Sequence, residues 1–202
     1  TGKEGKQREA LKRWWLLRMR YTDRPLQEKM TLFWHGLLTS GFSKVNSLPF
    51  LQAQNEFLRA NALGNFQTLL IGISKDPAML LWLDGNNSRK RSPNENYGRE
   101  LMELFSMGIG NYSEEDVKAA ARAFTGWLVN RETGVAVFRP REWDDGVKTF
   151  LGQTGRWDCN DIIDIICRQR ATAEYISRRL FSFFAYRNPA PETVSRLADV
   201  FV

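Results

Sequence analysis

Apolar residues recur along most of this chain at spacings of three and four, which is the period of an amphipathic α-helix. In the segment 25–39 one such stripe consists of Leu26, Met30, Phe33 and Leu37. Further apolar residues on the other faces of this segment indicate a buried helix. The same criteria predict helices over 6–21, 25–39, 47–63, 66–73, 77–83, 94–107, 113–128, 160–168, 171–186 and 191–201.

Only two short runs, 134–138 and 148–151, have the composition of β-strands. They flank a polar turn and predict a minor β-hairpin around residues 135–151. The predicted fold class is therefore all-α, an irregular multi-helix domain with this small β element. We expect residues 1–202 to form a single helical domain. The uncapped beginning and the apolar end of the sequence indicate a fragment of a longer chain.

Hydrophobic residues make up 43% of the sequence, which is ample for a core. No apolar run reaches the ~18 residues of a membrane span. The net charge is +6, and basic residues gather in 3–24 and 168–187. These clusters are either solvated helix faces or a nucleic-acid surface at the two basic ends. We favour the first interpretation because no nucleic-acid-binding motif accompanies the charge.

The densest polar sequence lies in 92–105, at the start of a predicted helix. On a wheel of 100° per residue, Glu95, Arg99 and Glu103 share one face at spacings of four, which predicts a ladder of ion pairs. The core-facing arc of this wheel consists of Tyr97, Leu101, Leu104, Phe105 and Gly108.

Asn96 and Glu100 lie on the edge between these two faces. A carboxylate at such an edge is partly desolvated and needs a partner. Arg122, Lys148, a backbone amide or a metal ion could fill that role for Glu100. The pair Glu100 and Glu103 resembles helix-borne carboxylate metal sites, but those sites usually add histidines, which are scarce here.

Three further polar residues are candidates for chemistry. Asp144 and Lys148 belong to a polar turn, which is either ordinary Asp-Gly turn chemistry or a ligand-binding loop. His35 is the only histidine, and it is either a hydrogen-bonded residue between packed layers or a catalyst. A His-rich zinc site cannot be assembled from one histidine. The sequence therefore assigns no metal and no cofactor. Cys159 and Cys167 lie too far apart along one helix for a disulfide.

An ordered series of motifs gives the chain a family resemblance. It is similar, from about Arg24 to its end, to the central part of DUF1800, a large bacterial family of unknown function. The motifs are Lys29–His35, Asn61–Phe66, Asp76–Leu80, Pro93–Tyr97, Arg99–Phe105, Asp116–Val117, Ala121–Trp127 and Lys148–Gly152.

The resemblance implies an exported, extracytoplasmic protein and a sulfatase-like partner of the DUF1501 family. It transfers no catalytic residue. The chain also departs from the family pattern, because Gly36–Leu38 follows His35 where members often have a further His or Phe. It has Trp143-Asp144 where members often have His-Asp before the Lys148 motif. Any family site built on those histidines is absent or differently made in this chain.

Three hypotheses follow. The leading one is a structural, scaffold-like helical module. The second is a hydrolase or metal-assisted enzyme with a polar site at the Asn94–Glu103 helix start, which requires its candidate groups to share one pocket. The third is nucleic-acid binding through the basic ends. The candidate catalytic residues of the second are Glu100, Asn96, Arg122, His35, Asp144 and Lys148.

Overall fold

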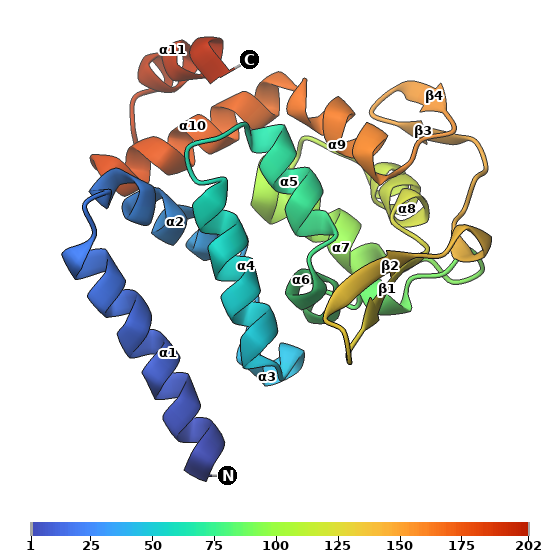
Figure 1. Cartoon of the computed structure of the whole chain (residues 1–202). Coiled ribbons are helices and arrows are strands. Elements are labelled where there is room, and N and C mark those ends of the chain that lie inside the picture. The colour runs from blue at the N-terminus through green and yellow to red at the C-terminus, as the bar shows by residue number, and fades with distance from the viewer. Residues whose placement is uncertain (1, 202) are drawn as a thin grey trace.

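The computed structural model describes residues 2–201, except for the side chain of Lys3. Helices make up most of the molecule, and the long helix α1 extends away from the others on one side (Figure 1). The two termini lie at opposite ends of this view. The α-helices are α1 (Gly2–Tyr21), α2 (Pro25–Leu37), α3 (Phe42–Val45), α4 (Leu48–Ala60), α5 (Phe66–Ser74), α6 (Pro77–Trp82), α7 (Glu95–Glu100), α8 (Glu114–Ala123), α9 (Cys159–Cys167), α10 (Arg170–Phe184) and α11 (Pro191–Phe201).

Two small antiparallel sheets complete the fold, which confirms the predicted mostly helical class with a minor β element. Strand β1 (Trp127–Asn130) pairs with β2 (Val135–Phe138), and β3 (Lys148–Phe150) pairs with β4 (Gln153–Gly155). The two runs noted in the sequence thus each pair with a close neighbour instead of with each other. Tight turns with positive φ explain this, at Gly134 (+69°) and at Leu151 and Gly152 (+46° and +77°).

Helix starts follow the local sequence closely. Asp76 caps α6 by accepting a hydrogen bond from the Met79 amide, and Pro77 occupies the first helical turn. Ser113 and Asp116 form a reciprocal capping box at α8. Helix α8 ends at Ala123, before Gly126 with its φ of +89°, so Leu128 lies in β1 and not on the predicted helical stripe.

The main core lies between α2, α5, α8, α9 and the segment η2 (Leu101–Ser106), which continues α7 as a π-helix. A π-helix closes i→i+5 hydrogen bonds, so its turn is wider than 3.6 residues. The helical wheel of 100° per residue therefore predicts the buried face of this segment wrongly. Leu104 is 47% exposed, whereas Met102 and Ser106 are fully buried.

The inner face of α2 also differs from its predicted stripe. Phe33 and Leu37 are buried as expected, but Leu26 is 55% exposed and the carboxylate residue Glu28 is only 3% exposed. Cys159 and Cys167 are both free thiols at the two ends of α9, as their spacing predicted. The buried Glu28 is explained by an ion-pair partner described below.

Candidate functional site

Arg122, in the last turn of α8, forms a bidentate ion pair with Asp144. Its Nε lies 2.7 Å from Asp144 Oδ2 and its Nη2 lies 3.1 Å from Oδ1. The backbone amide of Asp144 donates to Thr125 Oγ1 at 2.8 Å, which fixes this residue further. Hydrogen bonds from Arg122 hold the pKa of Asp144 below its ordinary value. Asp144 is therefore an ionised structural acceptor at neutral pH.

Lys148 lies beside this pair and is only 1% exposed. Its ammonium group donates to the carbonyl oxygens of Asp144 (2.6 Å) and Gly146 (2.9 Å), and it lies over the Trp143 ring at 5.4 Å. Burial lowers the pKa of Lys148. The structure thus brings three of the six candidates together in one cluster, in which Arg122 pairs with the Asp144 carboxylate and Lys148 donates to backbone carbonyl oxygens.

Asn96 and Glu100 lie elsewhere, on α7. Asn96 donates to Asp84 Oδ2 at 3.3 Å, and Asp84 also accepts from Lys44 at 2.6 Å. The partly exposed Glu100 carboxylate has no hydrogen bond or ion pair within residues 2–201. Burial, and then the nearby charge of Glu103, raise the pKa of Glu100. The predicted partners Arg122 and Lys148 are engaged with the Asp144 segment instead.

The predicted ion-pair ladder on α7 exists only in part. Arg99 contacts Glu95 at 3.3 Å, but its strongest contact is with Glu114 of α8, whose two oxygens lie 2.7 Å away. Glu103 instead accepts a hydrogen bond from the Tyr112 hydroxyl at 3.1 Å. The wider π-helical turn carries Glu103 out of line with Arg99.

His35 lies in a third place, on α2, which Figure 1 shows on the opposite side of the molecule from α8. Its ring meets the edge of Trp15 of α1 with centroids 4.8 Å apart. The buried Nδ1 atom has no hydrogen-bond partner among the described residues. Burial lowers the pKa of His35, so the imidazole is neutral near pH 7. Among the described residues, no hydrogen bond or ion pair joins Asn96, Glu100 or His35 to the cluster of Arg122, Asp144 and Lys148, although α7 packs against α8.

The model of one family, described as "Protein of unknown function (DUF1800)", matches residues 1–202. The chain belongs to the DUF1800 family. The match also covers the first 23 residues, where the motifs alone gave no resemblance. No curated protein and no solved structure matches the chain. Membership leaves the biochemical function of this DUF1800 chain to be argued from its own residues.

A buried ion-pair cluster that the sequence analysis missed joins α1, α2 and α4 of this DUF1800 chain. Arg59, 2% exposed, donates from Nε to Glu28 Oε1 at 2.6 Å. Arg18 and Trp15 of α1 also donate to Glu28, at 2.8 and 3.3 Å. Burial opposes ionisation of Glu28, but the hydrogen bonds from Arg59 and Arg18 outweigh it and hold its pKa below the ordinary value. One signal was available, namely a lone carboxylate in a helix apolar nearly all round.

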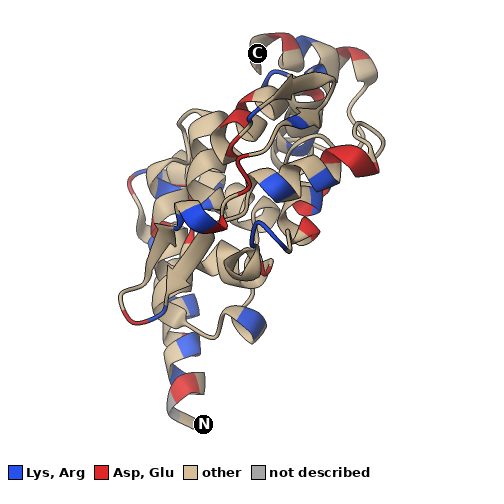
Figure 2. Cartoon of the chain, turned by 90° about the vertical axis from the view of Figure 1, so that its right-hand side faces the viewer, with Lys and Arg blue, Asp and Glu red and all other residues tan. Residues whose placement is uncertain are grey.

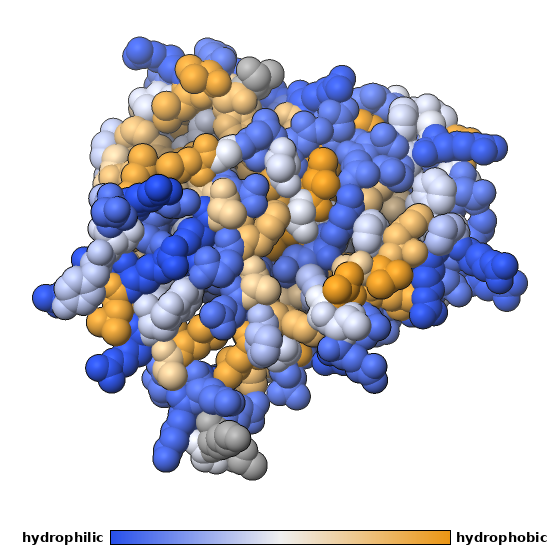
Figure 3. All heavy atoms as spheres, in the orientation of Figure 1, coloured by the Kyte–Doolittle hydropathy of each residue, from blue (hydrophilic) through white to orange (hydrophobic). Residues whose placement is uncertain are grey.

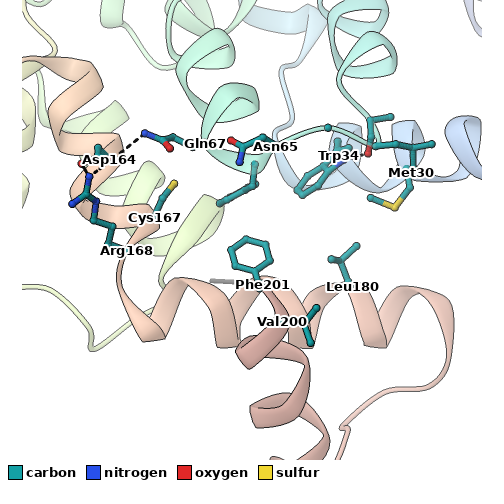
Figure 4. A pocket seen from close by; sticks show the side chains of 14 residues that line it. Met30, Trp34, Asn65, Gln67, Asp164, Cys167, Arg168, Leu180, Val200 and Phe201 are labelled. Carbon is teal, nitrogen blue, oxygen red and sulfur yellow. Dashed lines mark hydrogen bonds and ion pairs between the residues drawn. The ribbon is translucent and has the colours of Figure 1, made fainter.

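A cavity of about 690 Å³ lies between α2, α5, α9, α10 and α11 (Figure 4). Apolar side chains such as Trp34 and Phe201 line most of it. Its polar end is closed by Asp164, which accepts from Gln67 at 3.1 Å and contacts Arg168 at 2.8 Å. Burial raises the pKa of the Cys167 thiol to about 12, so this thiol stays protonated and unreactive.

The surface of this DUF1800 chain is mixed in charge and polarity. Figure 2 shows basic residues interspersed with acidic ones, and Figure 3 shows apolar side chains in several separate groups. In the C-terminal basic region, Arg168 contacts Asp164 and Arg170 contacts Glu174 at 2.9 Å. Within the described part of the chain, every helix is too short or too polar to cross a lipid bilayer.

Proposed function

We propose that this DUF1800 chain is a non-enzymatic, scaffold-like helical module. The observation that supports it is the engagement of Arg122, Asp144 and Lys148 in contacts that join α8, the segment before β3, and β3 itself. These groups hold the fold together at the place where three of the six candidate catalytic side chains meet.

Their protonation states agree with a structural role. General acid–base catalysis at neutral pH works best with a group whose pKa lies near 7. Asp144 has a lowered pKa, and the pKa of Arg122 is raised above an already high value by the hydrogen bonds that Arg122 donates to Asp144. Neither side chain exchanges a proton readily near neutral pH, and each holds the other in a fixed orientation.

The setting of the module follows from family analogy alone. Such a module would act outside the cytoplasm, beside a sulfatase-like protein of the DUF1501 family. We do not favour nucleic acid as its partner. Arg168 and Arg170 of the C-terminal basic region already contact carboxylates, which reduces the charge available to phosphates.

A second candidate function is a hydrolase that uses Glu100. It is favoured by one observation: this carboxylate is partly desolvated, has a raised pKa, and lies next to a π-helical segment. π-Helical turns occur frequently at functional sites. An enzyme of this kind would use Glu100 as its proton carrier, without help from His35 or Asp144, which lie elsewhere.

A hydrolase panel separates the two functions. The protein would be incubated with chromogenic ester, phosphate, sulfate and glycoside substrates, with and without Mg²⁺, Mn²⁺, Ca²⁺ and Zn²⁺. The scaffold proposal predicts no turnover above that of the Glu100→Gln variant. Turnover that disappears in Glu100→Gln but persists in the matched surface variant Glu115→Gln would overturn it in favour of the hydrolase.

A further inference from the structure

A second cavity lies where α1 meets the rest of the molecule. Its polar groups differ from those of the cavity shown in Figure 4. Its volume is about 250 Å³, below the ~300–1,000 Å³ typical of pockets for drug-sized ligands. It is lined by residues of α1, α2, α3 and α4 and is mainly apolar. Its apolar and aromatic walls are formed by Leu11, Trp14, Trp15, Phe42, Leu48 and Leu51.

Asn55 of α4 lines this cavity and is 94% buried, with only 6% of its surface exposed. Its Oδ1 accepts from Arg59 Nη2 at 2.6 Å, and this contact fixes the orientation of the amide. The other end of the amide, Nδ2, is a buried donor with no hydrogen-bond partner among the described residues. A buried donor without an acceptor is rare and unfavourable. A partner for this atom has to be a hydrogen-bond acceptor, because an amide nitrogen only donates.

His35 Nδ1 is a second buried polar atom without a partner, and His35 lines the same cavity. The neutral imidazole can present Nδ1 as a donor, depending on its tautomer. Two unpartnered polar atoms thus come from different helices, α2 and α4. Neither belongs to the Glu28 ion-pair cluster itself, although Asn55 is oriented by it through Arg59.

The charged residues that line the cavity are both cationic. Arg8 and Lys12 project from α1, and no Asp or Glu is among the lining residues described. Arg8 lies over the Phe42 ring at 4.6 Å, and Lys12 contacts Glu9 at 2.8 Å. A ligand here meets aromatic walls, a buried amide donor and positive charge.

We propose that this cavity binds a small aromatic carboxylate, whose ring lies against the aromatic walls and whose carboxylate accepts from Asn55 Nδ2. A carboxylate is an acceptor-only group at neutral pH and complements both the free donor and the Arg8 charge. The volume suits a ligand of one or two rings. This inference goes beyond the scaffold function, since a module can bind such a ligand without transforming it.

The test uses indole-3-acetate and its neutral amide, indole-3-acetamide, as probes. Binding to the whole protein would be followed by NMR at the Trp15 indole and Asn55 side-chain signals. We expect a dissociation constant of about 1 mM or tighter for the acid, in line with ~0.3 kcal/mol per ligand atom. The amide should bind at least ~10-fold more weakly, which corresponds to the loss of one charge-assisted contact.

Variants locate the site. Asn55→Asp keeps the oxygen that accepts from Arg59 but replaces the free donor with an acceptor, so it should weaken binding of the acid at least ~10-fold. Arg8→Gln, on an exposed side chain, should weaken it by a smaller factor without affecting folding. Asn87→Asp makes the same change of charge at an exposed position away from the cavity and should leave affinity unchanged.

The proposal is overturned by an absence of saturable shifts up to ~10 mM acid, ten times the weakest expected dissociation constant. Equal binding of acid and amide, or unchanged affinity in both Asn55→Asp and Arg8→Gln, would overturn it as well. If Asn55→Asp does not fold, the acid–amide comparison and Arg8→Gln decide. A failure here leaves the scaffold function standing, because that function depends on the absence of Glu100-dependent turnover.

Discussion

Two polar regions of this molecule differ in how completely their groups are paired. Around Asp144, the sequence is rich in charge, and the structure shows Arg122 and Lys148 satisfied by contacts within the cluster. Around Asn55 and His35, the sequence has no dense polar motif, yet two buried polar atoms beside a cavity are without partners among the described residues. The comparison teaches that a dense polar motif can be structural, and that an unsatisfied buried group is the better sign of a binding site.

The largest expected effect is in the Glu28 cluster that supports the second region. Glu28→Gln should lower the free energy of unfolding at pH 7 by about 3–5 kcal/mol, because it removes the buried carboxylate that pairs with Arg59 and leaves only the more exposed Glu56 beside this guanidinium. The pKa of Glu28 is held below its ordinary value, so the stabilisation is present above pH ~4.3 and is lost as the pH falls through the folded-state pKa. Urea unfolding from pH 3 to 7 measures both effects. A change below 1 kcal/mol at pH 7, comparable with Glu115→Gln, would contradict the buried pair.

Asp144→Asn tests whether the first region is structural. Loss of the charged hydrogen bonds to Arg122 should cost about 1.5–3 kcal/mol of unfolding free energy. The neighbouring Asp145 is exposed and pairs with Lys90 on the surface, so Asp145→Asn should cost less than ~1 kcal/mol. Chemical denaturation of the two variants measures the difference. Equal effects of both changes would remove the distinction between a structural cluster and an ordinary surface turn.

Asp76 provides a pH-dependent test of a buried carboxylate that accepts hydrogen bonds. Burial raises its pKa to about 6, even though it accepts from the Met79 amide and Gln54. Because the folded-state pKa lies above the unfolded value, stability should fall as the pH rises from ~4 through 6. Asp76→Asn can keep both acceptor contacts and should be more stable at pH 7 by on the order of 1–3 kcal/mol. Thermal unfolding would be followed between pH 4 and 7. The same slope of melting temperature against pH in both proteins would contradict this.

The smallest expected effect concerns the π-helical segment η2. Leu104→Ser should change the free energy of unfolding by less than ~0.5 kcal/mol, because Leu104 is largely exposed. Met102→Ala, the control in the same segment, should cost about 2–5 kcal/mol, because Met102 is fully buried. Guanidinium unfolding of both variants would show the opposite ranking if the segment were an ordinary α-helix with Leu104 in the core.

Local features of the fold were predictable from the sequence, whereas features set by distant contacts were not. The caps at Asp76 and Ser113 depend on a few adjacent residues, and they form as predicted. The π-helical turn was not predictable, because a single extra residue per turn leaves no local signature in the pattern of apolar residues. It changed the placement of Leu104 and of Glu103.

The candidate site shows the same limit. Arg122, Asp144 and Lys148 were identified by type, but only the structure shows that Arg122 pairs with the Asp144 carboxylate and that Lys148 donates to backbone carbonyls of the same turn. Asn55 was not identified at all, since its role depends on Arg59, which orients its amide, and on a cavity wall supplied by α1. Glu28 and Arg59 are 31 residues apart in the chain, so the lone carboxylate in an otherwise apolar helix could signal a buried partner but not which residue it is.

The most direct test of the contrast between the two regions is one NMR titration of the protein with indole-3-acetate, followed at both regions. The account predicts saturable shifts at the Asn55 side-chain amide and the Trp15 indole, with no change at the Arg122 Nε–H signal. Saturable shifts at Arg122, with Asn55 and Trp15 unchanged, would contradict it and would place the binding site in the charge-rich region.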